Sequence, residues 1–114
     1  MKEIYSKEEV LSCIGLSERF FVLFFKYSPR CELCVAANEI LEKLEKDRND
    51  PNIFIFRINV LESKEASQSL EQLSKVKHES PQCIAYMRFN PYFSVSHTKI
   101  TQNFLETAIP RPPQ

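Results

Sequence analysis

Residues 20–34 read FFVLFFKYSPRCELC, an apolar run followed within a few positions by two thiols. The run Phe20–Phe25 is apolar at every position, which is typical of a central strand that is covered on both faces. Apolar residues then recur at the helical period, and this pattern predicts a helix from Cys31 to about Lys46. Cys31 and Cys34 would therefore lie where a strand passes into a helix. Exposed amides and the helix dipole at such a terminus favour a thiolate, so the pattern indicates redox chemistry.

The rest of the chain alternates helical and strand patterns. The expected elements are a short helix after Ser6, a strand at 20–25, a helix at 31–46, a strand at 53–60, a helix around 66–76, strands at 83–89 and 92–96, and a helix at 101–108. A short turn around Asn90-Pro91 would make the last two strands antiparallel. This order gives a β-α-β unit followed by β-β-α, which closes into a four-stranded mixed sheet with helices on both faces. We therefore expect an α/β protein with a thioredoxin-like fold.

Composition narrows the classes of function. The 114 residues fit one domain, which we place at residues 1–109 with a Pro-rich tail at 110–114. Hydrophobic residues make up 43% of the chain, enough for a core without a disulfide framework. The 15 basic and 15 acidic side chains balance, which argues against a nucleic-acid partner. The sequence contains no secretory signal pattern and no run long enough to span a bilayer, so we expect a cytoplasmic protein.

The two thiols of the CxxC motif would have different roles. Cys31 would attack a disulfide, and Cys34, one helical turn further on, would reach the same sulfur and resolve the product. Glu32 places a negative charge beside the attacking sulfur, which Arg30 would offset. We therefore expect the pKa of Cys31 to lie modestly below that of free cysteine.

Two other interpretations of the motif stay open. A CxxC pair is half of a zinc site, but a structural zinc ion needs four ligands. The remaining candidate ligands lack a second paired spacing: Cys13, Cys83, His78 and His97. Alternatively, the two thiols are inert helix residues, because free cysteine is often a small buried hydrophobe. That second interpretation is the one we favour for Cys13 and Cys83, since each lies in an apolar segment.

Pro81 precedes a strand-like run, a position at which strands tolerate proline. In thioredoxin folds a cis-proline faces the active-site thiol across a groove. We therefore expect a cis bond before Pro81, with Ser80 offering its backbone to an extended substrate. His78 would protonate a leaving thiol or tune its pKa, although a plain exposed loop histidine fits equally well. Phe25 occupies the place where thioredoxins carry a buried aspartate.

Two motifs carry a resemblance to a known family. Residues 76–82 read VKHESPQ and residues 96–101 read SHTKIT. These segments resemble the monothiol bacilliredoxin family, which typically has V-x-H-E-S-P-Q and S-H-x-x-I-T there. The active-site pattern of the family is approximately H-S-x-x-C-P-x-S. This chain retains its first serine as Ser28 and its cysteine as Cys31, and it has Cys34 where the pattern has its final serine.

The resemblance implies removal of a low-molecular-weight thiol, bacillithiol or a similar one, from cysteines of oxidised or S-thiolated client proteins. Cys31 would capture the small thiol, and Cys34 would expel it as an internal disulfide forms. No cofactor is required, and thioredoxin folds of this size are commonly monomers. Two rivals stay open: a general thioredoxin-like disulfide reductase, and a binding module that holds a metal or cluster through Cys31 and Cys34.

Overall fold

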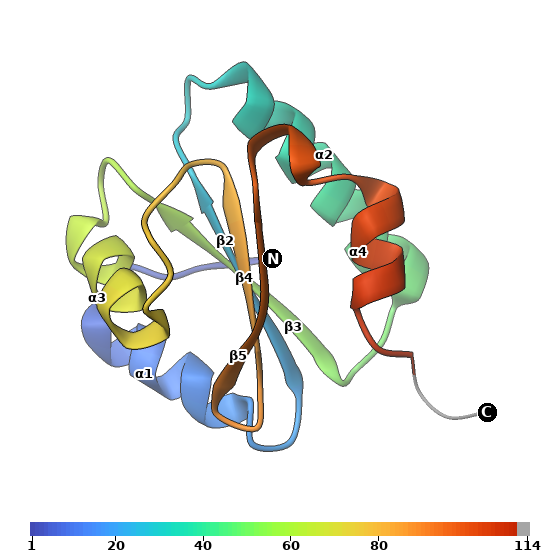
Figure 1. Ribbon diagram of the computed structural model, residues 1–114, viewed down its shortest axis with the longest axis horizontal. Coiled ribbons are helices and arrows are strands. Elements are labelled where there is room, and N and C mark those ends of the chain that lie inside the picture. Colours follow the sequence, from blue (N-terminus) through green and yellow to red (C-terminus); the bar gives the residue numbers. More distant parts are fainter. Residues whose placement is uncertain (112–114) are drawn as a thin grey trace.

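The computed structural model describes residues 1–111 as a central sheet with helices on both faces (Figure 1). The elements are β1 (Lys2–Glu3), α1 (Lys7–Leu16), β2 (Phe21–Tyr27), α2 (Glu32–Arg48), β3 (Ile53–Asn59), α3 (Lys64–Ser74), β4 (Gln82–Met87), β5 (Asn90–Ser96), the 3-10 helix η1 (His97–Lys99) and α4 (Gln102–Ala108). The last three residues of the expected tail, 112–114, lie outside the described residues. Within the described range, no helix combines the length and the apolar character needed to cross a bilayer.

The sheet has the strand order β1-β3-β2-β4-β5. Strands β1, β3 and β2 run parallel, and β4 and β5 are antiparallel to their neighbours. The predicted mixed sheet and thioredoxin-like fold are confirmed, but the predicted number of four strands is wrong. The sequence pattern missed β1, because two polar residues carry no strand period.

Strand β2 is buried on both faces, as its continuous apolar run predicts. Phe21, Leu23 and Phe25 belong to the core cluster shared with α2 and α4, whereas Val22 and Phe24 belong to the cluster shared with α1 and α3. Alternating side chains of a single strand therefore hold both helical layers on the sheet. This central position fixes the place where the chain leaves β2 and enters α2.

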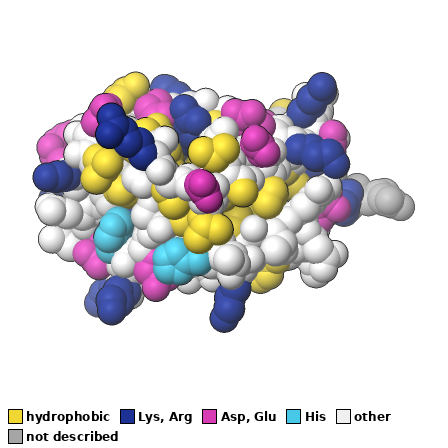
Figure 2. All heavy atoms as spheres, turned by 90° about the horizontal axis from the view of Figure 1, so that it is seen from above, with side chains coloured by type: hydrophobic (Ala, Val, Ile, Leu, Met, Phe, Trp, Pro, Cys, Tyr) yellow, Lys and Arg dark blue, Asp and Glu magenta, His cyan; other side chains and the backbone are white. Residues whose placement is uncertain are grey.

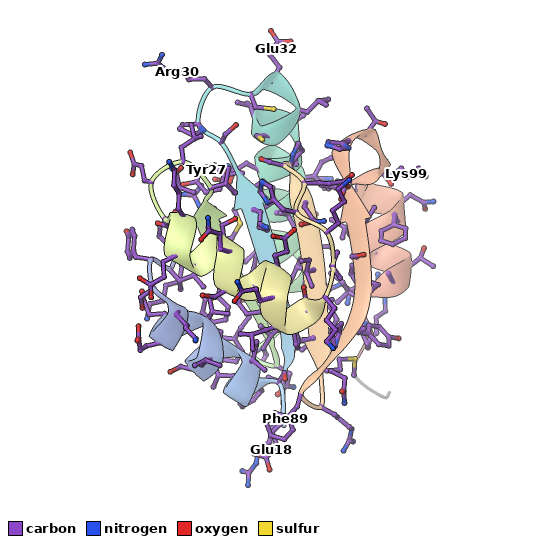
Figure 3. All side chains as sticks on the ribbon, turned by 60° about the vertical axis from the view of Figure 1, so that its left-hand side comes forward. Glu18, Tyr27, Arg30, Glu32, Phe89 and Lys99 are labelled. Atoms are coloured by element: carbon purple, nitrogen blue, oxygen red, sulfur yellow. The ribbon has the colours of Figure 1, made fainter. Side chains whose placement is uncertain are left out.

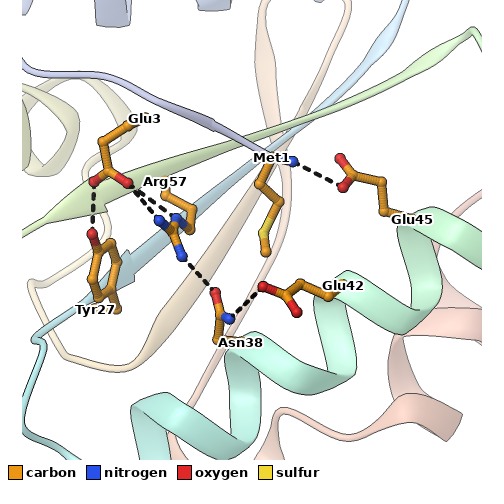
Figure 4. A network of polar contacts seen from close by, with 7 residues as sticks. All are labelled: Met1, Glu3, Tyr27, Asn38, Glu42, Glu45 and Arg57. Atoms are coloured by element: carbon orange, nitrogen blue, oxygen red, sulfur yellow. Dashed lines mark hydrogen bonds and ion pairs between the residues drawn. The ribbon is translucent and has the colours of Figure 1, made fainter.

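The added strand β1 is held by a polar network on the sheet edge (Figure 4). The Glu3 carboxylate lies 3.0 Å from the Arg57 guanidinium and accepts a 2.8 Å hydrogen bond from the Tyr27 hydroxyl. Arg57 also donates to the Asn38 side chain of α2 at 2.9 Å and lies over the Tyr27 ring. The network thus joins β1 to β2, β3 and α2.

The β4–β5 turn differs from the predicted one. Arg88 and Phe89 form the turn with φ angles of 51° and 69°, and Asn90 and Pro91 belong to β5. A two-residue hairpin of this kind needs positive φ at both positions and is usually built from Asn-Gly. Contacts from Ser17 compensate here, because its hydroxyl oxygen accepts the Phe89 N–H at 2.9 Å.

Candidate active site

Cys31 is the N-cap residue of α2. Its backbone is extended, with φ −102° and ψ 123°, and its Sγ accepts the N–H of Cys34 at 3.4 Å. The thiol is partly exposed, while Arg30 and Glu32 on either side extend away from the body of the protein (Figure 3). An extended residue followed at once by helical ones points its side chain back at the free amides of the first turn. Cys31 thus occupies the position at which a thiolate is best stabilised.

The pKa of Cys31 lies below its ordinary value. The largest cause is a hydrogen bond from the Cys34 thiol, followed by the Cys34 backbone N–H, with a smaller contribution from the Leu33 N–H. Desolvation and the charge of Glu32 oppose the shift. The predicted direction is confirmed, but Arg30 is not among its causes. The second cysteine therefore activates the first.

Replacing Cys34 should therefore weaken the acidity of Cys31. In Cys34→Ala we expect the pKa of Cys31 to rise, because the thiol donor is lost while the backbone N–H remains. The pH dependence of Cys31 alkylation by iodoacetamide, followed by mass on the peptide that contains Cys31, measures this change. An unchanged midpoint would mean that the helix amides alone set the pKa.

Cys34 lies in the interior, with only 2% of its surface exposed. Its Sγ accepts the backbone N–H of Ser28 at 3.4 Å and lies 3.6 Å from the Ser80 hydroxyl. Neither Cys31 nor Cys34 forms a disulfide. The exposed thiol is thus the one that incoming molecules meet, and the buried thiol lies behind it.

The Ser80-Pro81 segment lies beside Cys34 in the fold, although 46 positions separate Ser80 from Cys34 in the sequence. The bond between these residues is cis, Ser80 is half-buried and Pro81 is buried. The carbonyl of Pro81 accepts the N–H of His97 at 3.0 Å. The residues after β5 therefore lie directly beside this loop, a proximity that the sequence did not indicate.

His78 lies on the α3 side of the molecule. Its backbone N–H donates to the Glu71 carboxylate at 2.7 Å, and its side chain lines a groove with Lys64, Ser67 and Glu71. Burial lowers the pKa of His78, and the charge of Lys26 lowers it further. Among the described residues, no hydrogen bond joins His78 to Cys31 or Cys34.

The remaining cysteines belong to the core, as predicted. Cys83 is fully buried and Cys13 is 5% exposed. Burial raises the pKa of Cys13 to about 11 and that of Cys83 still further, so both stay protonated and unreactive. Within residues 1–111, no group of three or more His, Cys, Asp or Glu side chains is arranged to hold a metal ion.

Two further positions, Phe25 and Ser28, bear on the interpretation of the site. Phe25 is fully buried in the core, so an apolar ring stands where thioredoxins have an acid. Ser28 contacts the Cys34 sulfur but was not predicted as a site residue. Its only sequence signal is its place three residues before Cys31, where the bacilliredoxin pattern also has serine.

Comparison with solved structures places the fold. A thioredoxin-fold protein described as an oxidoreductase has 20% identity and a TM-score of 0.83, with 94% of this chain and 91% of that chain covered. Fasciola hepatica thioredoxin has 14% identity and a TM-score of 0.74, with 94% of each chain covered. Thioredoxin O1 from Arabidopsis thaliana has 15% identity and a TM-score of 0.74, with 94% and 96% covered. At these identities the likeness concerns the fold alone.

Comparison with models of protein families identifies the family as well as the fold. The model for monothiol bacilliredoxin BrxC matches residues 2–105, which include both thiols and the Ser80-Pro81 segment. An exposed cysteine of lowered pKa on a thioredoxin fold is the chemical equipment of a thiol oxidoreductase. The protein is a thiol oxidoreductase, and the chain belongs to the monothiol bacilliredoxin family.

Proposed function

We propose that this protein removes low-molecular-weight thiols, bacillithiol or a similar one, from the cysteines of S-thiolated client proteins. Cys31 is the attacking thiol and Cys34 the resolving thiol. Ser80 and Pro81 bind the substrate backbone, and His78 acts at their flank. We further propose that the protein is a cytoplasmic monomer and that residues 1–109 form its single domain.

One observation carries this proposal: the unequal exposure of the two thiols. Cys31 is partly exposed and has a lowered pKa, while Cys34 is buried and its backbone N–H donates a 3.4 Å hydrogen bond to the Cys31 sulfur. Exchange is fastest when the attacking thiol has a pKa near ambient pH. A partly exposed attacking thiol with a buried second thiol one helical turn away suits a two-step exchange.

The first step transfers the small thiol. The Cys31 thiolate attacks the sulfur of the small thiol in the mixed disulfide, a new S–S bond forms on Cys31, and the client leaves as a thiolate that takes up a proton. In the second step the Cys34 thiol loses its proton and attacks the Cys31 sulfur, which releases the small thiol. Two electrons have then passed from the cysteine pair to the mixed disulfide, and an external thiol or dithiol reductant must restore the pair.

We propose that His78 contributes to client binding and proton transfer without contacting the attacking sulfur. Its lowered pKa keeps the imidazole neutral at neutral pH, so it would accept or pass on a proton rather than supply a fixed charge. Its place on the α3 side suits contact with the client rather than with the attacking sulfur. Its exposed side chain is therefore available to a bound client.

The two-step route is tested by intact mass after challenge with a peptide that carries bacillithiol in a mixed disulfide. We expect Cys34→Ser to accumulate the bacillithiol adduct on Cys31, because the resolving sulfur is absent. The wild type should instead lose two hydrogens as the internal disulfide forms. An adduct that persists in the wild type would make Cys34 a bystander and the protein a monothiol enzyme.

The two rivals predict other results. A general disulfide reductase would reduce a peptide with an internal disulfide as fast as the mixed disulfide, but the apolar Phe25 and the match at residues 76–82 favour the mixed-disulfide substrate. A metal-binding module would yield stoichiometric metal after anaerobic purification. Metal that is lost in Cys31→Ser would contradict the redox proposal.

A further inference from the structure

The sulfur of Cys34 lies among three hydrogen-bonding groups of two serines. The backbone N–H of Ser28 donates to this sulfur at 3.4 Å. The Ser80 hydroxyl lies 3.6 Å from it and the Ser28 hydroxyl 4.0 Å from it, and in both pairs either atom can be the donor. Only 2% of Cys34 is exposed, so solvent contributes little to this environment. The two serines thus provide the polar surroundings of the buried sulfur.

The second step of the proposed exchange requires a negative charge on this sulfur. Cys34 attacks as a thiolate, and burial makes a charge costly unless hydrogen bonds compensate it. Phe25 places an apolar ring where thioredoxins have a buried aspartate. Among the contacts of residues 1–111, neither a carboxylate nor an imidazole is hydrogen-bonded to the Cys34 sulfur. The groups that can compensate the charge are therefore those of Ser28 and Ser80.

A hydroxyl group suits both protonation states of this sulfur. It carries one donor hydrogen and two acceptor lone pairs, and it rotates to use either. While Cys34 is a thiol, the Ser80 oxygen can accept the S–H hydrogen. Once the proton has left, the same hydroxyl can turn and donate to the thiolate. Ser80 can therefore stay hydrogen-bonded to Cys34 before and after deprotonation, which an ionised carboxylate cannot do because it only accepts.

The side chain of Gln82 holds the loop that carries Ser80. Gln82 is buried, and its Nε2 donates to the Lys77 carbonyl at 2.9 Å and to the Ser96 hydroxyl at 3.3 Å. Its Oε1 accepts the N–H of Glu79 at 3.4 Å. One amide thus binds two backbone groups of the loop and a side chain of β5. The Ser80 hydroxyl is therefore carried by a segment with a fixed position beside the sulfur.

The Ser28 groups are fixed by the end of β2. Residue Tyr27 is the last of β2 and pairs with Asn59 of β3. Its carbonyl also accepts the N–H of Val60 at 2.9 Å, which continues the backbone hydrogen bonding past the end of β3. Ser28 follows directly, so its N–H and hydroxyl leave the sheet from an anchored residue. Both serines are therefore positioned by backbone contacts that do not involve Cys34.

The order in which the two thiols react follows from their exposure. Figure 2 looks onto the end of the molecule where α2 begins, and apolar side chains gather across the middle of this face. Cys31 is partly exposed, whereas Cys34 is buried. An incoming disulfide therefore meets Cys31 first, and Cys34 reacts with the new disulfide on Cys31. Groups that contact only the Cys34 sulfur consequently act in the second step.

We propose that the hydroxyls of Ser80 and Ser28 stabilise the Cys34 thiolate in the second step, with Ser80 the stronger donor. The thiolate attacks the Cys31 sulfur of the mixed disulfide, the Cys31–Cys34 bond forms, and the bond to the small thiol breaks. The small thiol leaves as an anion and takes up the proton that Cys34 has lost. This inference rests on the proposed function and adds two catalytic residues to it.

The test separates the two steps with the aromatic disulfide dithiobis(nitrobenzoate). Attack by Cys31 releases one coloured thiolate from the reagent, and attack by Cys34 on the resulting adduct releases a second. Stopped-flow absorbance therefore resolves two phases. Cys34→Ser should show the first phase alone, which identifies the second phase as the reaction of Cys34. The reagent contains no bacillithiol, so the result does not depend on which small thiol the protein removes.

Loss of the hydroxyls should slow the second phase selectively. We expect Ser80→Ala to slow it about tenfold, the worth of a hydrogen bond to a charged group, and to leave the first phase unchanged. Ser28→Ala should slow it only about threefold, because the hydroxyl is the more distant one and the backbone N–H remains. Ser80→Thr keeps a hydroxyl and should restore the second phase. Ser94→Ala, at an exposed position in β5, is the matched control and should change neither phase.

Three outcomes would overturn the inference. If Ser80→Ala leaves the second phase unchanged, the hydroxyl does not stabilise the thiolate. If Ser80→Ala slows both phases equally, or Ser80→Thr is as slow as Ser80→Ala, the residue acts through the shape of the loop. If the wild type shows one phase only, Cys34 does not resolve the adduct. Failure of the proposed function is seen separately, as two normal phases with this reagent but no removal of bacillithiol from a peptide.

Discussion

Cys31→Ser is expected to lower the rate constant for mixed-disulfide reduction by at least about a thousandfold, as loss of a nucleophile does in other enzymes. A serine hydroxyl stays protonated at neutral pH and does not attack disulfide sulfur, so the first step cannot occur. Release of the client thiol from an S-thiolated peptide measures the rate. Iodoacetamide alkylation of the peptide that contains position 31 should be lost as well.

We expect Cys31→Ser to abolish the reaction without destabilising the fold. Serine is among the best N-cap residues, so Cys31→Ser keeps a side-chain acceptor for the Cys34 N–H at the start of α2. Cys13→Ala is the matched control, because that thiol is buried and its pKa is raised to about 11. We expect the control to retain the wild-type rate. A Cys31→Ser protein that still reduces the peptide would disprove the assignment of the attacking thiol.

Lys26→Met is expected to raise the free energy of unfolding at pH 7 by about 2 kcal/mol. Lys26 is fully buried, and its ammonium group has one hydrogen bond, to the Ser67 carbonyl at 3.4 Å. Burial lowers the pKa of Lys26 from 10.5 to about 8, with Glu71 opposing the shift. A shift of that size corresponds to roughly 3 kcal/mol of unfavourable burial, from which about 1 kcal/mol is subtracted for the lost contacts.

The same shift gives the wild type a pH dependence with a definite sign. Between pH 8 and 10.5 the folded Lys26 has lost its proton while the unfolded one keeps it. The unfolded state then binds more protons, so stability rises with pH across that window. Urea unfolding at several pH values should show this rise in the wild type and not in Lys26→Met. Lys43→Met, at an exposed position, is the control, and an equal rise in both proteins would contradict the prediction.

Local patterns predicted the helices and most strands because each depends on residues close in sequence. The apolar run of β2 and the helical period of α2 both follow from backbone geometry within one element. The position of Cys31 at the start of α2 is of the same kind. Burial of Cys13 and Cys83 also followed from their apolar neighbours.

Other features escaped the sequence because their stabilising partners are distant. The two-residue β1 exists through pairing with β3 and through the contacts of Glu3 with Arg57. The β4–β5 turn was misplaced because Arg88 and Phe89 are poor turn residues by composition. Their positive φ angles are supported by Ser17, about seventy residues earlier in the chain.

The amino-acid sequence by itself determined the fold class and the reactive pair, because strand period, helix period and the CxxC spacing are local properties. Only the tertiary structure decided that Cys34 is buried, that Ser80 lies 3.6 Å from its sulfur and that His97 is bonded to Pro81. These contacts join segments far apart in the sequence. Their geometry is set by how the helices and the hairpin pack on the sheet, which no local pattern encodes.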